Sequence, residues 1–225
     1  MTMAPTRLVL WAGLLPILAV NLAYLINVTS GADLCFPYLE GCQSVSRGLR
    51  SGPGLWLFKL LALPCAVFML LAWRETPDAV DRMIPDGRPL SAAVVGLGLT
   101  STFFFLVYAV WLGTEGDIYR WLRRYGVVFY FAGAGLAHLL IMSRLWQARR
   151  RVGAPCMGLW IRTYCGMVAL TWATGVASAL KRNLSDDPLF LDRLENALEW
   201  NFALCLSLCF LALAPLIRGR GERGA

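Results

Sequence analysis

The sequence has one histidine, His138, and few charged residues for its length. Charged residues make up 16% of its 225 residues, whereas a soluble domain carries about 25%. The apolar fraction is 58%. This combination is typical of a membrane protein rather than of a soluble domain. A lone histidine also excludes bis-histidine haem ligation within the chain.

Motifs of known chemistry are missing from the sequence. It has no GxSxG nucleophile elbow, no HExxH zinc motif, no P-loop and no glycine-rich dinucleotide motif. Its seven cysteines form no CxxC pair, so we expect no zinc site. A Ser-His-acid triad would have to join His138, in the middle of an apolar run, to serines at the surface. The sequence therefore predicts no metal and no cofactor, and it identifies no reaction.

Six apolar runs are long enough to cross a membrane, for which a helix needs about 20 residues. They cover residues 8–26, 55–73, 92–112, 126–146, 157–180 and 197–217. Backbone groups in hydrocarbon must be satisfied internally, and these runs are too continuous for the alternating strands of a barrel. The first run exceeds the apolar core of about 7–15 residues that marks a signal peptide, so we expect a retained helix. We predict an all-α bundle of six transmembrane helices, forming one domain over residues 1–225.

Basic residues indicate how the bundle is oriented. The side that holds both termini carries more arginine, including the run at 149–151, so the positive-inside rule places both termini in the cytoplasm. The net charge of +7 comes mostly from residues at the ends of the runs, and no phosphate-contacting stripe indicates nucleic-acid binding. A composition rich in Arg, Ala, Gly and Leu is typical of a GC-rich bacterium, which predicts the inner membrane.

The longest connection, residues 27–54, lies outside the cell in this orientation. Long loops of compact proteins often carry function. Arg47 and Arg50 suit a lipid phosphate, because guanidinium is a planar fork of donors, and Ser44 and Ser46 can donate beside them. The alternative is a solvated loop whose arginines rest on lipid headgroups.

Two of the cysteines, Cys35 and Cys42, share this connection. In an oxidising space they can form a disulfide, but spacing alone does not establish the geometry. A disulfide and a pair of free thiols both stay open. The other cysteines lie within or at the edges of apolar runs, where cysteine behaves as a small hydrophobe.

Three ionisable residues, Lys59, His138 and Arg162, fall within apolar runs. Intramembrane ionisable groups are functional candidates by default. The alternative is that Lys59 and Arg162 extend to the membrane interface, and that His138 is hydrogen-bonded inside the bundle. Tryptophans near the predicted helix ends indicate an aromatic belt; these are Trp56, Trp73, Trp111, Trp121, Trp146 and Trp200.

Polar groups also cluster at the outer ends of three segments. The turn after the third run contains Glu115, Asp117 and Arg120, and the sixth run opens with Glu199. We expect these groups to converge with Arg47 and Arg50 on one site. A carboxylate near hydrocarbon is costly unless it is paired, so we predict Glu199 within salt-bridge reach of an Arg or Lys. This pairing has two interpretations, a lipid headgroup site and a structural lock.

The order of short motifs resembles the DRAM/Frag/Sfk family of six-helix membrane proteins. The resemblance rests on Pro37-Tyr38, the 44–50 stretch, Trp56, the 113–117 turn, Arg124-Tyr125-Gly126 and Glu199-Trp200. Two features depart from the family. Its acidic Ser-Asp-Thr-Gly type element is replaced by the 40–47 stretch, and the histidine that opens its fourth helix is replaced by Arg123 or Arg124. The resemblance implies lipid handling, with no agreed reaction.

These observations favour a non-enzymatic protein that binds or helps organise membrane lipid at the outer leaflet. One alternative is a lipid-modifying hydrolase or transferase with Ser44 or Ser46, Asp117 and Glu199 in its site. Another is a transporter or an assembly subunit of a membrane complex. A water-filled path lined by Lys59, His138 and Arg162 would distinguish the transporter.

Overall fold

The computed structural model describes residues 3–81, 91–152 and 155–221, apart from the side chains of 148–157 and 219–221. These residues are mostly helical and contain no strand. Six of their helices are long and apolar enough to cross a membrane. They are α1 (Pro5–Thr29), α4 (Pro53–Asp81), α5 (Ser91–Trp111), α6 (Asp117–Val152), α7 (Pro155–Leu180) and α8 (Pro188–Gly221). The predicted all-α bundle of six helices is confirmed.

Each predicted run lies almost wholly within one of these helices, but several helices are longer than predicted. Helix α6 begins at Asp117 rather than at residue 126, and α8 begins at Pro188 rather than at residue 197. The start of α8 is fixed by Asp187, whose carboxylate accepts the Leu189 backbone N–H at 2.9 Å, and by proline at the first helical position. Hydropathy detects the apolar part of a helix, whereas caps determine where the helix ends.

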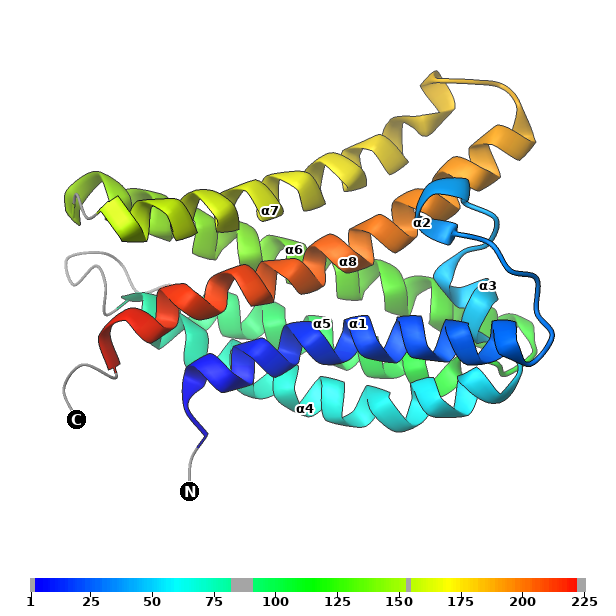
Figure 1. Ribbon diagram of the computed structural model, residues 1–225, viewed down its shortest axis with the longest axis horizontal. Coiled ribbons are helices and arrows are strands. Elements are labelled where there is room, and N and C mark those ends of the chain that lie inside the picture. The colour runs from blue at the N-terminus through cyan, green and yellow to red at the C-terminus, as the bar shows by residue number, and fades with distance from the viewer. Residues whose placement is uncertain (1–2, 82–90, 153–154, 222–225) are drawn as a thin grey trace.

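The six helices form a ring in which each packs against two neighbours. The order around the ring is α1, α4, α5, α6, α7 and α8, and α8 packs again on α1. Both chain termini lie at one end, which we call the terminal end (Figure 1). The opposite end carries α2 (Pro37–Glu40) and α3 (Val45–Leu49), which belong to the α1–α4 connection. We call this the cap end.

Small residues let these helices approach closely, as expected where van der Waals packing holds a bundle together in lipid. A Cβ added to Gly98 of α5 would lie 2.3 Å from the Trp73 ring of α4. One added to Gly126 of α6 would lie 3.0 Å from the Tyr108 nitrogen of α5. Larger side chains at either glycine would force neighbouring helices apart.

The cytoplasmic location of the termini stays a prediction. The structure places both at one end of the bundle, as an even number of crossings requires. Arg82 and Arg88, which contributed to the predicted orientation, lie outside the described residues, and the side chains at 149–151 are likewise outside them.

Candidate functional site

The α1–α4 connection is a folded cap rather than a solvated loop. Within residues 30–52, which we call the cap, α2 and α3 both pack on the bundle. Asn27 of α1 anchors the α3 side. Its side-chain nitrogen donates to the carbonyl oxygens of Gly48 and Ser51, both at 2.9 Å, and its oxygen accepts the Gly54 N–H at 2.8 Å. Asn27 is buried, so these bonds tie α1, α3 and the start of α4 together.

Helix α8 holds the cap from the other side. Three of its side chains donate to cap carbonyls: Asn196 to Gly41 (2.9 Å), Trp200 to Gln43 (2.9 Å) and Asn201 to Tyr38 (2.8 Å). Gly41 has φ +59°, and a Cβ there would lie 1.8 Å from the Arg193 carbonyl oxygen. A glycine is therefore required where the cap meets α8.

A disulfide joins Cys35 and Cys42, the pair for which the sequence left two alternatives, with Cα atoms 6.6 Å apart. The Tyr24 hydroxyl of α1 donates to the Cys35 carbonyl oxygen at 3.1 Å. The disulfide therefore closes the α2 part of the cap, and the tyrosine fixes that part to the bundle.

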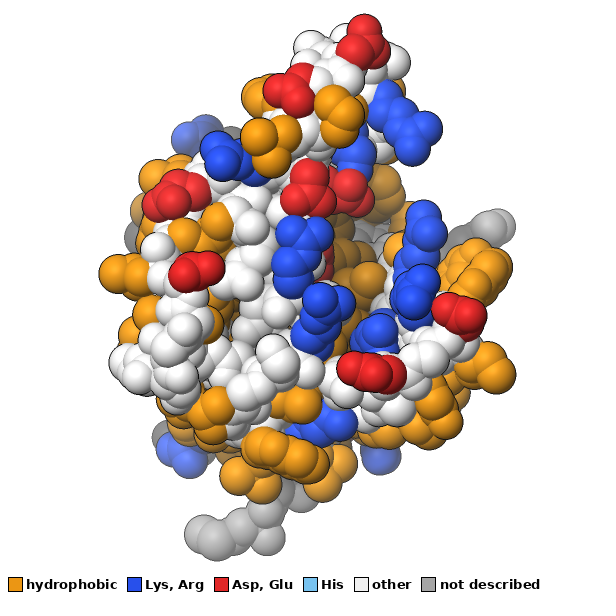
Figure 2. Space-filling view, turned by 90° about the vertical axis from the view of Figure 1, so that its right-hand side faces the viewer, with side chains coloured by type: hydrophobic (Ala, Val, Ile, Leu, Met, Phe, Trp, Pro, Cys, Tyr) orange, Lys and Arg blue, Asp and Glu red, His pale blue; other side chains and the backbone are white. Residues whose placement is uncertain are grey.

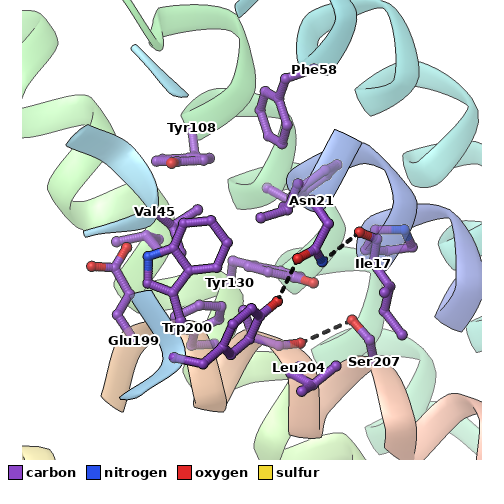
Figure 3. Close-up of a pocket in the computed structure, with 17 residues that line it drawn as sticks. Ile17, Asn21, Val45, Phe58, Tyr108, Tyr130, Glu199, Trp200, Leu204 and Ser207 are labelled. Carbon is purple, nitrogen blue, oxygen red and sulfur yellow. Dashed lines mark hydrogen bonds between the residues drawn. The ribbon is translucent and has the colours of Figure 1, made fainter. Parts of the chain in front are cut away.

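A cavity lies beneath the cap, between α1, α4, α5, α6 and α8 (Figure 3). Its volume is about 610 Å³ when the open mouth is included. The centre of a water-sized sphere can occupy only about 50 Å³ of this volume. The cavity is therefore narrow. Tyr38 and Val45 of the cap close it from above, and its walls are mainly aromatic and aliphatic side chains.

Polar groups of the cavity are few, and most are already bonded. The Tyr38 hydroxyl donates to the Asn21 side-chain oxygen at 3.0 Å, and the Ser207 hydroxyl donates to the Ala203 carbonyl at 2.9 Å. Burial raises the pKa of Tyr38, which keeps its hydroxyl a donor. The buried Tyr108 hydroxyl has no hydrogen bond of good geometry among the described residues, although the Ser46 side chain lies close to it.

Glu199 lines the cavity, half-buried, without an ion pair in the described part of the chain. The predicted salt bridge to Glu199 is therefore wrong. Arg47 instead binds Asp192, with both terminal nitrogens 3.3 Å from its carboxylate oxygens. Asp192 is the more exposed carboxylate, and pairing there removes less water from the two charges. The Ser46 backbone N–H is positioned to donate to the Glu199 carboxylate.

A polar hollow lies beside the cavity at the cap end. It offers about 550 Å³ to the centres of water molecules and is lined by Arg50, Glu115, Arg120 and Arg123, with backbone and small residues of 51 and 113–116. Figure 2 shows basic side chains around a depression on this end, with hydrophobic side chains in its depth. Arg123 of the hollow and Val127 of the cavity lie about one turn apart on α6. The hollow and the cavity are therefore neighbours at the cap end of α6.

The single site predicted from the sequence is thus two adjacent spaces. Arg50, Glu115 and Arg120 share the hollow, and Asp117 forms an ion pair with Arg120 at 3.4 Å. Ser44 is the N-cap of α3, where its hydroxyl accepts the Arg47 N–H at 3.1 Å. Ser44 therefore has a structural role.

Neither the cavity nor the hollow, as the described residues form them, is lined by any of the three intramembrane ionisable residues. The Lys59 nitrogen lies 5.8 Å from the Trp56 ring centre, and Arg162 is exposed on α7. His138 is buried, and its Nδ1 lies 2.9 Å from the Tyr164 hydroxyl. This arrangement matches side chains that reach an interface and a histidine that is bonded inside the bundle.

The prediction of an aromatic belt was wrong for two of its six tryptophans. Trp73 and Trp200 are each 1% exposed, so they belong to the core. Trp200 packs edge-on against Tyr24 and Tyr38, with ring centres 5.4 and 5.2 Å away. Position near a helix end does not show which way a ring points.

Sequence reasoning missed the residues that build the cap. Asn27, Asn196 and Trp200 were not recognised as anchors, and neither Tyr108 nor Tyr130 was placed in a site. One signal was available, since asparagines recur near the cap ends of α1 and α8, at 21, 27, 196 and 201. Asparagine in an apolar helix needs a partner, and a neighbouring irregular connection supplies carbonyls.

No family model, curated protein or solved structure matches the chain. The resemblance to the DRAM/Frag/Sfk family therefore stays a prediction.

Proposed function

We propose that the protein binds a membrane phospholipid at its cap end, with an acyl chain in the cavity and the headgroup at the hollow. The observation that carries this proposal is the cavity itself. It is apolar, narrow, enclosed by five of the spanning helices, and adjacent to a surface hollow with three arginines. A narrow apolar space suits an acyl chain, and arginine suits a phosphate.

Affinity in this site would come from the headgroup rather than from the chain. A lipid tail leaves one apolar environment for another when it moves from the bilayer into the cavity, so it gains little from the hydrophobic effect. Charge-assisted hydrogen bonds to phosphate are the stronger term. Arg50 is exposed and forms no ion pair within the described residues, so its guanidinium can bind a phosphate.

Glu199 adds a second element of recognition. Its carboxylate lines the cavity, which adjoins the hollow, so an acceptor is available on the cavity side of the arginines. A headgroup that carries a donor, such as an amine or a hydroxyl, would satisfy Glu199 while its phosphate binds arginine. We therefore favour a phospholipid with such a headgroup.

No specific observation on the described residues favours the alternative functions. The Ser44 hydroxyl is used as a helix cap, and His138 is bonded to Tyr164 inside the bundle, so these two residues do not form a serine–base pair. In the described part of the chain His138 is buried whereas Arg162 is exposed, so these side chains do not face one common space. By composition and arginine count, we further propose that the membrane is a bacterial inner membrane and that the cap faces outward.

The test is mass spectrometry of phospholipid retained by the purified full chain. We expect Arg50→Gln combined with Arg120→Gln to lower the retained phospholipid per protein several-fold. Arg182→Gln is the matched control, because Arg182 is an exposed arginine of η1 (Lys181–Asn183) at the same end, outside the hollow. Equal retention by wild type and the double variant would contradict the proposal.

A further inference from the structure

A second apolar space lies between α6, α7 and α8. It offers about 330 Å³ to the centres of water molecules. Its walls include Ala132 and Gly135 of α6, Trp172 and Gly175 of α7, and Phe202 of α8, and no charged residue lines it. We call this space the lateral groove.

The groove is open because α6 and α7 separate and small residues face the gap. Figure 1 shows the two helices diverging toward the cap end. They are linked by a long hydrogen bond from the Trp172 ring nitrogen to the Gly135 carbonyl, at 3.4 Å. A Cβ added to Gly135 would meet no atom within 4 Å, so the groove reaches the backbone of α6.

Two phenylalanines stand between the groove and the cavity. Phe131 lines both spaces, and Phe202 lines the groove. Their ring centres are 4.6 Å apart with the planes tilted by 38°. Both rings are half-buried, so neither is enclosed by protein on all sides.

We propose that the lateral groove is the entrance through which a lipid chain passes from the bilayer into the cavity, with Phe131 and Phe202 as its gate. This inference rests on the proposed lipid binding. The groove lies between helices that cross the membrane, so hydrocarbon faces it, and its uncharged walls admit a chain but not a headgroup. Tyr38 and Val45 of the cap cover the cavity from above, and three hydrogen bonds hold the cap on α8.

The test separates the rate of lipid exchange from the amount of lipid bound. Full-length protein carrying its retained lipid is mixed with excess chain-deuterated phospholipid in detergent micelles, and native mass spectrometry follows the replacement. Gly135→Phe fills the groove. Gly166→Phe is the matched control, because Gly166 also has open space around an added Cβ but lies outside the groove. Phe202→Ala removes half of the gate.

We expect Gly135→Phe to slow exchange by about tenfold or more, equivalent to a barrier about 1.4 kcal/mol higher, without changing the amount bound. Gly166→Phe should exchange like wild type, and Phe202→Ala should exchange faster. Retained lipid with the same exchange rate in all four proteins would overturn the entrance but leave the proposed function standing. Wild type that retains no lipid would overturn both. A change from dimer to monomer mass in Gly135→Phe would show that the groove holds a second copy of the chain instead.

Discussion

The two ends of the bundle hold their buried polar groups in different ways. At the cap end, side chains of α1 and α8 donate to backbone carbonyls of an irregular segment, as Asn27 and Asn196 do. In the middle and terminal half, the polar core contains the ion pair of Asp81 with Arg144 and the contact of His138 with Tyr164. Irregular backbone near hydrocarbon needs partners, and the buried side chains of the cap end supply them as neutral hydrogen bonds.

The two ends also differ in their unsatisfied groups. Among the described residues, six buried side-chain polar atoms have no partner, and the Tyr108 hydroxyl is the one at the cap end. The others belong to Trp73, Thr76, Ser101, His138 and Arg144. At the cap end, the buried side chains of Asn27, Asn196 and Trp200 are hydrogen-bonded to the backbone of the cap. The buried Tyr108 hydroxyl is the exception. This contrast predicts that mutations at the two ends affect stability and ligand retention differently.

The largest effect on stability is expected at the terminal end. The side chains of Arg144 and Asp81 are 9% and 19% exposed, and their charged atoms lie 3.4 Å apart. Asp81→Asn leaves the buried guanidinium without this carboxylate, which costs about 3 kcal/mol of unfolding free energy. The measurement is the unfolding equilibrium of the protein in detergent, followed by steric trapping.

The double variant Asp81→Asn with Arg144→Gln is the control for this prediction. It removes both charges, so it should be more stable than Asp81→Asn alone. The loss of stability in the double variant is compared with the sum of the losses in Asp81→Asn and Arg144→Gln. If the two are equal, the two charges do not interact, and the proposed contrast between the two ends of the bundle is wrong.

The next largest effect is expected at the cap end. Asn27→Ala removes three hydrogen bonds and leaves two carbonyls of the cap region in need of partners, which costs about 2–3 kcal/mol. Asn183→Ala is the control, because Asn183 is exposed in η1. The melting temperature in detergent measures the loss. Equal melting temperatures for the two variants would show that Asn27 does not hold the cap.

The disulfide should contribute less than Asn27. Cys35→Ser with Cys42→Ser opens a link between residues separated by 7 positions, and so short a loop stabilises by about 2 kcal/mol. A reducing agent should lower the melting temperature of wild type and leave that of the double variant unchanged. A wild type that is insensitive to reduction while its thiols become labelled would contradict this prediction.

The smallest effect compares one substitution at both ends. Tyr164→Phe deprives buried His138 Nδ1 of its partner at 2.9 Å, and Tyr38→Phe deprives half-buried Asn21 of its partner at 3.0 Å. We expect a loss of about 1–2 kcal/mol for Tyr164→Phe and about 0.5–1 kcal/mol for Tyr38→Phe. Of the two variants, only Tyr38→Phe should also change the retention of phospholipid, because Tyr38 lines the cavity. Equal retention by both variants would remove the distinction between the ends.

The sequence indicated which segments form the candidate site, but not which side chains contact each other within it. The sequence indicated the α1–α4 connection, the turn before α6 and the start of α8 as polar places at one end, and the structure brings Arg50, Glu115 and Arg120 together there. The predicted ion pair of Glu199 was wrong because Arg47 binds Asp192, which lies two turns earlier on the same helix. Sequence alone does not rank two carboxylates by their exposure.

Hydropathy by itself determined that the chain forms six membrane-spanning helices, because a continuous apolar run in lipid has no other way to satisfy its backbone. Local chemistry likewise determined the start of α8 through Asp187 and Pro188. Only the tertiary structure decided that Trp200 is buried, that the connection is a cap and that Phe131 separates two apolar spaces. These features depend on how helices distant in sequence rotate and separate around the ring. In an almost uniformly apolar helix, the sequence pattern carries little information about which face turns inward, because lipid and core are equally apolar.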